Sequence, residues 1–347
     1  GVNTDFTPAG PIPSPGTSPV GWEETGLERF SSYVYMLWNP WADLHLTWGI
    51  AYDHLRHPRN IEIPPVSGAT TEVEAVSPKV GIDYGIMPGL RLRGAYAASL
   101  GGVFYDQGMR LEPTQVGGFL QTFRSGAPES LSGLLPGTLF DMAGVAVELN
   151  RPRGTYWTLQ YVHLEADSER DRGVFQQVIK DFFEASSVTE DVRYREQALA
   201  LTLNQLVGPT VALGAEYALS HADLRQTVRG VLPDAPSPTK GPDVDFDASS
   251  VLQTVRVFGL FNHREGFFAD AEAVFHVQAP RGDAVLAGGG GFWQVNAGLG
   301  YRLPRRRAAL RLGVLNLTGE DYRLHPLNLH VSPPRARSFT VSLKVQF

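Results

Sequence analysis

Hydrophobic and polar side chains alternate strictly at the end of the chain, between Ser338 and Phe347. Every odd position from Phe339 to Phe347 is apolar, and every even position is polar. Because successive side chains of a β-strand point to opposite faces, this segment predicts a strand with one apolar face and one hydrated face. The same period of two can be followed through the rest of the sequence.

Six further pairs of segments alternate in this way, and each pair is joined by a short turn marked by Pro or Gly. Turns of this composition are typical of β-hairpins. The connections between pairs are longer, about 11 to 40 residues, and the strands of about 10 to 13 residues suit a tilted membrane crossing. With the final strand, the pattern predicts about 13 antiparallel strands. The predicted hairpins are 30–38 with 43–53, 77–86 with 90–99, 140–150 with 155–165, 191–206 with 210–221, 251–262 with 267–279, and 291–303 with 306–316.

Short turns at one end and long loops at the other are typical of outer-membrane β-barrels. We therefore predict an all-β fold, an antiparallel transmembrane β-barrel of the outer membrane, over residues 28–347. Residues 1–27 carry Pro11, Pro13 and Pro15, and we expect them to form a loop or linker. Because bacterial barrels close with an even number of strands, we expect upstream strands to complete a closed barrel of about 14 to 16 strands.

The composition excludes several classes of protein and of functional site. With 43% hydrophobic residues, a mean hydropathy of -0.13 and no apolar run of about 18 residues, the sequence predicts no transmembrane helix. The lack of cysteine excludes disulfides, zinc–thiolate sites and a Cys nucleophile, and a net charge of -6 argues against a nucleic-acid partner. No cofactor is predicted. Ser220 and His221 point to opposite faces of a predicted strand, and no Gly-x-Ser-x-Gly motif occurs, so we do not expect an enzyme.

Polar residues opposite the apolar face of each strand are candidates for a pore lining, because lumen water solvates them and their charges can select solutes. Both signs of charge occur, so no anion or cation preference follows. A hydrated wall without selectivity is the alternative interpretation. The candidates are Asp43, His45, Arg91, Arg93, Arg256, Asp270, Glu272, His276, Arg302 and Lys344.

Two loops carry further candidates. Asp243, Asp245 and Asp247 alternate, so their carboxylates share one face, and oxygen-rich clusters suit calcium. Ordinary solvated carboxylates are the simpler interpretation of these three residues. The loop from Leu100 to Leu139 contains several apolar side chains that should pack against other parts of the protein. We expect this loop either to fold into the lumen as a constriction or to form an ordered outer cap.

Several stretches resemble known families. The strand that ends at Phe347 resembles the C-terminal signature of outer-membrane barrels, which implies that Phe347 is part of an assembly signal for the barrel assembly machinery. The segment 313–323, followed by Pro333 and Pro334 and the final strand, is similar to the end of TonB-dependent receptors. Four more segments resemble the barrel of tetratricopeptide-repeat outer-membrane proteins, and these are 77–84, 90–96, 111–119 and 261–269.

The two families imply different functions. The helical-repeat resemblance implies a pore for passive diffusion or export, with polysaccharides among the exported substrates, and this is the function we expect. The barrel of a TonB-dependent importer is one alternative, and a structural or adhesive barrel with a closed lumen is another. The expected location is the outer membrane of a Gram-negative-type bacterium. Expected partners are outer-membrane lipid and lipopolysaccharide, the barrel assembly machinery, and a periplasmic partner or a covalently linked N-terminal domain.

Overall fold

Thirteen strands form one antiparallel sheet in which sequential strands are neighbours, and a separate two-stranded hairpin, β5–β6, lies between β4 and β7 in the chain. No helix among the described residues is long and apolar enough to cross a membrane. The computed structural model describes residues 26–60, 67–101, 112–121, 136–179, 182–229, 245–283, 289–304, 307–320 and 336–345.

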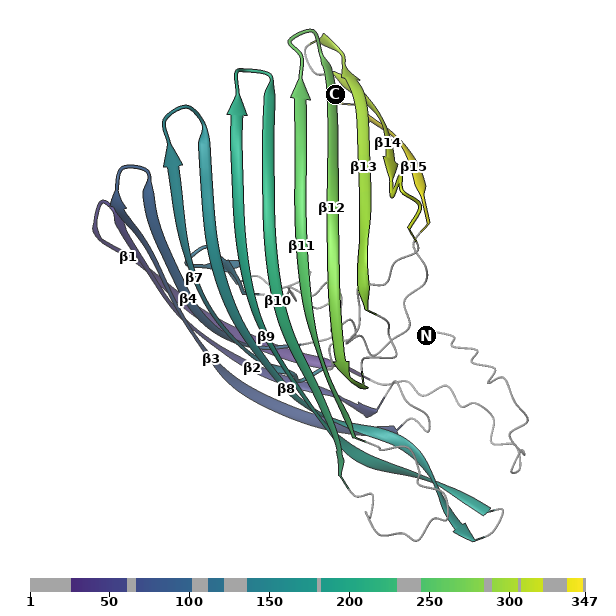
Figure 1. The fold of residues 1–347 in the computed structure, drawn as a ribbon. Helices are drawn as coiled ribbons and strands as arrows, with labels where there is room; N and C mark the ends of the chain where they lie inside the picture. The colour runs from purple at the N-terminus through teal and green to yellow at the C-terminus, as the bar shows by residue number, and fades with distance from the viewer. Residues whose placement is uncertain are drawn as a thin grey trace.

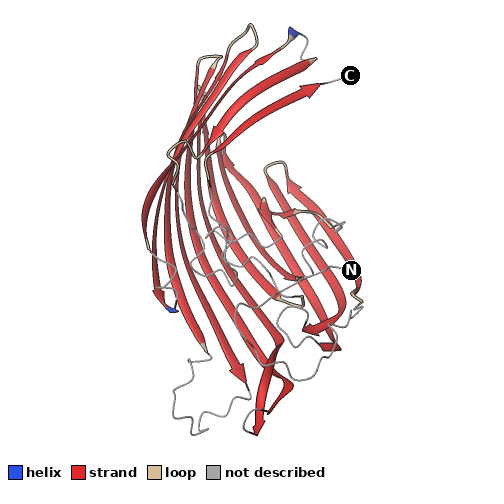
Figure 2. Ribbon diagram, turned by 90° about the vertical axis from the view of Figure 1, so that its right-hand side faces the viewer, coloured by secondary structure: helices blue, strands red, loops and turns tan. Residues whose placement is uncertain are grey.

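All thirteen predicted sheet strands are present, and the sheet curls into a curved, open wall (Figures 1 and 2). The strands are β1 (Glu28–Trp41), β2 (Leu44–Asn60), β3 (Ser67–Met87), β4 (Leu90–Leu100), β5 (Gln115–Val116), β6 (Phe119–Leu120), β7 (Leu139–Arg151), β8 (Thr155–Ile179), β9 (Phe182–Val207), β10 (Val211–Arg229), β11 (Phe246–Asn262), β12 (Phe267–Gly282), β13 (Gly290–Arg302), β14 (Ala308–Leu315) and β15 (Ser338–Val345).

The register gives the sheet two chemically different faces. Directly opposed residues share a face, so Lys79 on β3 lies on the same side as Gly49 on β2 and Ala97 on β4. This side is the inner face. The alternate residues form the outer face, which carries exposed large side chains such as Trp48 and Trp157. A continuous exposed apolar band on one side of a long antiparallel sheet is the arrangement that a lipid bilayer requires.

The two ends of the sheet differ. Tight turns follow β1, β3, β7, β9, β11 and β13 at one end, which the length asymmetry of outer-membrane barrels assigns to the periplasm. At the opposite, outer end, β8 and β9 extend beyond their neighbours (Figure 1). β1 and β15 form the two edges of the sheet and run in the same direction, from the outer end toward the tight turns.

The strand lengths predicted from the sequence were wrong for several strands, although β4, β7 and β13 match the predicted bounds within two residues. β8 has 25 residues and β9 has 26, whereas β14 and β15 have 8 each. The predicted long connection after Glu165 is instead a continuation of the β8–β9 ladder, which leaves only residues 180–181 between the two strands. Residues 168–172 of β8 are polar on both faces of the strand, so no apolar alternation marks this part although backbone pairing continues.

A hydrophobic core lies on the inner face of the outer half of the sheet. It includes Met142 on β7, Leu164 on β8, Tyr194 on β9 and Leu224 on β10. Leu224 is 0% exposed and Tyr194 is 1% exposed. The inner wall at this level is therefore packed rather than hydrated.

Candidate functional site on the inner wall

The β5–β6 hairpin packs directly against the inner wall, with contacts from β5 to β3 and β4. Glycines make this close approach possible. A Cβ atom at Gly81 would lie 2.5 Å from the backbone nitrogen of Gly117, and one at Gly144 would lie 2.5 Å from the ring of Phe119. Both distances are too short for any real side chain, so the hairpin can pack this closely against the wall only because both positions are glycine. Of the two arrangements expected for the Leu100–Leu139 loop, the described residues 112–121 fit the inward-folded one.

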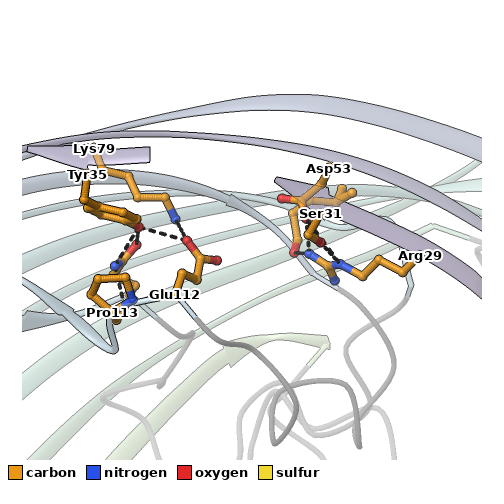
Figure 3. Close-up of polar contacts among 9 residues, drawn as sticks. Arg29, Ser31, Tyr35, Asp53, Lys79, Glu112 and Pro113 are labelled. Atoms are coloured by element: carbon orange, nitrogen blue, oxygen red, sulfur yellow. Dashed lines mark hydrogen bonds and ion pairs between the residues drawn. The ribbon is translucent and has the colours of Figure 1, made fainter. Parts of the chain in front are cut away.

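A polar anchor holds the start and the end of the hairpin (Figure 3). Lys79 Nζ lies 3.0 Å from Glu112 Oε2, and its side chain is 1% exposed. Tyr35 donates a hydrogen bond to the same carboxylate oxygen at 2.9 Å and accepts one from the Gln121 amide at 3.0 Å. Gln121 also donates to the carbonyl oxygen of Pro113. The buried ammonium group is therefore matched to a carboxylate that comes from the hairpin segment, which ties the hairpin to β1 and β3.

Arg93 on β4 forms a second anchor. Its guanidinium lies 2.5 Å from Glu148 on β7 and donates to the carbonyl oxygen of Gly118 at 3.0 Å. It also lies over the Phe119 ring, 5.6 Å from the centroid. A residue predicted to line a pore thus holds the hairpin against the wall.

Ion pairs neutralise the inner face of β10–β14. Arg256 lies 3.6 Å from Glu216 and 2.8 Å from Glu272. Asn296 donates to Glu272 at 2.7 Å. Arg311 forms a bidentate pair with Asp270, and the shorter of its two distances is 2.6 Å. Alternating charges in such a network compensate one another locally, so this wall has no excess of one sign to select ions.

The structure places the predicted pore candidates on one face. By register, all of them except Asp43 project from the inner face of a strand. Asp43 lies in the turn between β1 and β2, where its carbonyl oxygen accepts a hydrogen bond from Gly85. The role of the candidate residues as a pore lining stays a prediction.

Four of the remaining candidates also contact neighbouring side chains, and Lys344 is placed by register alone. Arg91 lies 3.0 Å from Asp83, and Arg302 donates to Asn262 at 2.7 Å. His276 is mostly buried, between the Thr254 hydroxyl and the Phe292 ring. His45 lies 2.8 Å from Asn39, and Lys344 opposes Ala309 on β14.

Sequence reasoning missed several residues that complete these clusters, and these are Tyr35, Lys79, Glu112, Gln121, Glu148, Glu216 and Arg311. Glu216 and Arg311 could have been found, because each alternates with apolar neighbours in a predicted strand. Pairing the strands in register would have placed Glu216 opposite Arg256. Lys79 and Glu112 carried no such signal, because their partnership depends on how a loop folds back onto a distant strand.

The calcium candidates are only partly described. Asp243 lies outside the described residues, as does the assembly-signal residue Phe347. Asp245 accepts a hydrogen bond from the Val228 backbone at 2.9 Å, and Asp247 pairs with Arg225 at 3.1 Å. Within the described ranges, no group of three His, Asp or Glu side chains is arranged to hold a metal ion. The loop or linker predicted for residues 1–27 falls outside the described chain up to residue 25.

The sheet order, the alternating faces and the apolar outer belt define an outer-membrane β-barrel fold. No protein-family model matches the chain, and no curated protein matches it. Among solved structures, it is similar to Pseudomonas aeruginosa FpvA bound to heterologous pyoverdines, with 11% identity, a TM-score of 0.52, and coverage of 83% of this chain and 40% of that chain. The complex of FpvAI with pyocin S2 gives 10% identity, a TM-score of 0.55, and coverage of 83% and 41%.

The ferripyoverdine receptor of the Pseudomonas aeruginosa outer membrane, bound to ferripyoverdine, is also similar, with 10% identity, a TM-score of 0.51, and coverage of 83% and 40%. The chain therefore spans about two fifths of the length of these receptors. The fold belongs in the outer membrane of a Gram-negative-type bacterium. The fold shared with these receptors agrees with the TonB-dependent-receptor resemblance of the C-terminal strands, and nothing in the comparisons supports the tetratricopeptide-repeat resemblance.

Proposed function

We propose that this chain forms part of the barrel wall of an outer-membrane receptor that imports a bulky solute through a gated lumen. The passive or exporting pore expected from the sequence has no specific support from the comparisons, and the importer alternative fits them better. In this proposal, residues 28–347 supply barrel strands, and further strands join the β1 and β15 edges. Because these two edges run in the same direction, the barrel would stay fully antiparallel if an odd number of additional strands closed it between β15 and β1.

The packed inner face is the observation that carries this proposal. A passive pore needs a polar, water-filled lumen. Here Met142, Leu164, Tyr194 and Leu224 project inward and are buried, and the β5–β6 hairpin occupies part of the same wall. An inner surface of this kind is suited to a lumen that is closed at rest and opens only during transport.

A ferric chelate is the class of solute that we propose, by analogy with the pyoverdine complexes of the similar receptors. The ion-pair network around Arg256 and Arg311 provides hydrogen-bonding groups of both signs along the transport path. We propose transport rather than catalysis, with no cofactor. A periplasmic energy-coupling partner and the barrel assembly machinery complete the set of proposed partners.

Energised uptake tests this function. Cells that express the complete protein from its native gene would be given radiolabelled ferric siderophores, with and without a protonophore that collapses the inner-membrane gradient. The proposal predicts uptake that depends on both the protein and the gradient. Protein-dependent uptake that persists after the protonophore would contradict it and favour a passive pore.

A further inference from the structure

A cavity of about 330 Å³ lies between the β5–β6 hairpin and the inner wall beside it. The hairpin contributes Phe119 and Leu120 to the lining, and β7 and β8 contribute Phe140, Met142 and Leu164. No charged side chain is among the described residues that line the cavity. It therefore differs from the ion-paired wall of β10–β14, and an apolar lining of this kind suits an uncharged small molecule.

The cavity is elongated along the strands. Ser99 on β4 and Gln160 on β8 both line it. Ser99 is opposite Phe140 on β7, and Gln160 is opposite Ala146 on the same strand. These two positions on β7 are six residues apart, which is roughly 20 Å of strand. A volume of this size distributed over such a length is closer to the width of a methylene chain than to that of a fused ring system.

Two polar groups in the cavity have no partner within the described ranges. Ser99 is 7% exposed, and its hydroxyl makes no hydrogen bond to a described residue. The half-buried Gln160 amide makes none either. By contrast, the Gln121 amide, which also lines the cavity, donates to Tyr35 and to Pro113. Because buried polar groups are nearly always hydrogen-bonded, the Ser99 hydroxyl and the Gln160 amide are suited to bind a ligand.

The direction of the strands orients such a ligand. β4 leads away from the tight turn after β3, so Ser99, near the end of β4, lies toward the outer end of the wall. Gln160 lies near the start of β8 and therefore toward the tight turns. A molecule that enters from the outer end would place its polar head at Ser99 and its apolar chain along β7.

We propose that this cavity binds a neutral single-chain amphiphile, with an unbranched aliphatic chain between the hairpin and the wall and a hydroxyl head at Ser99. A hydroxyl head can both donate to and accept from the serine side chain. Met142 suits an aliphatic ligand, because its flexible thioether adapts to irregular apolar surfaces. The bound chain would contact Phe119 as well as the wall and would strengthen the attachment of the hairpin. Such a site goes beyond the proposed import function and does not depend on which solute the barrel carries.

Photoaffinity labelling of the complete protein in amphipol would test the proposal, with n-decanol that carries a diazirine on its chain as the probe. We expect saturable labelling of Met142 and Leu164, identified by tandem mass spectrometry and displaced by unlabelled n-decanol. Val162→Phe, which fills the cavity from β8, should abolish this labelling. Val147→Phe makes the same substitution on the outer face of β7, and this matched control should be labelled like the wild type.

Labelling of the wild type that is confined to lipid-facing side chains would overturn the site, as would equal cavity labelling in Val162→Phe. Ser99→Ala should weaken binding of the probe by about fivefold, since one neutral hydrogen bond is lost. An unchanged affinity in Ser99→Ala would overturn the position of the head group. Heat-modifiable gel mobility identifies correctly folded barrel in every variant, so lost labelling cannot be mistaken for lost structure.

Discussion

Single residues decide how closely the β5–β6 hairpin approaches the inner wall. Gly81 and Gly144 provide the space, since any Cβ at either position would collide with Gly117 or Phe119. Lys79 and Glu112 provide the attachment, because each is poorly solvated and each compensates the charge of the other. The segment around Glu112 is therefore held in place by its contacts with Lys79 and with the glycines of the inner wall.

Removing the buried ammonium group should weaken this attachment. Lys79→Met leaves the Glu112 carboxylate in a largely buried position without its cation, and we expect the free energy of unfolding to fall by about 3 kcal/mol. In Lys79→Met/Glu112→Gln, a neutral amide replaces the carboxylate, so part of this loss should be recovered. Urea unfolding in detergent micelles would measure all four members of this double-mutant cycle. Strictly additive changes would mean that the two residues do not act as a pair.

At the scale of elements, the alternation predicted which segments are strands but not how long they are. The bilayer imposes the apolar alternation, so the signal is strong only inside it. β8 continues beyond Glu165 through residues 168–172, which are polar on both faces, and nothing in that residue pattern separates such a strand from a loop. The residues that the alternation placed opposite the apolar face share one face in the register, except Asp43 in a turn, because parity is preserved along an uninterrupted strand.

Parity gives a direct test of which face contacts lipid. Leu201 points outward on β9, and its neighbour Thr202 points inward opposite Glu216. Leu201→Arg should cost about 2 to 4 kcal/mol of stability in lipid if it lies near the bilayer midplane. Thr202→Arg should be tolerated, because its guanidinium can pair with Glu216. Folding yield into lipid vesicles, read from heat-modifiable mobility, compares the two, and equal losses would contradict the assignment of the faces.

At the scale of the whole molecule, the sequence predicted the class of fold better than the function. An apolar belt, short periplasmic turns and thirteen strands follow from local patterns. Whether the lumen is open depends on contacts between residues far apart in sequence, such as Lys79 with Glu112 and Arg93 with Gly118. Loop residues that fold inward carry no periodic signal, so the candidate pore residues could be assigned to one face of the sheet while their ion-pair and hairpin partners were missed.

Planar-bilayer conductance of the complete protein, purified from its native membrane, tests the central claim that this wall belongs to a gated importer. The packed inner face and the anchored hairpin predict that reconstituted protein stays closed, without stable open-channel steps, at moderate voltage and neutral pH. A matched preparation of a known porin shows that the assay detects open barrels. Large, persistent single-channel steps from this protein would contradict the account and restore the passive or exporting pore as its function.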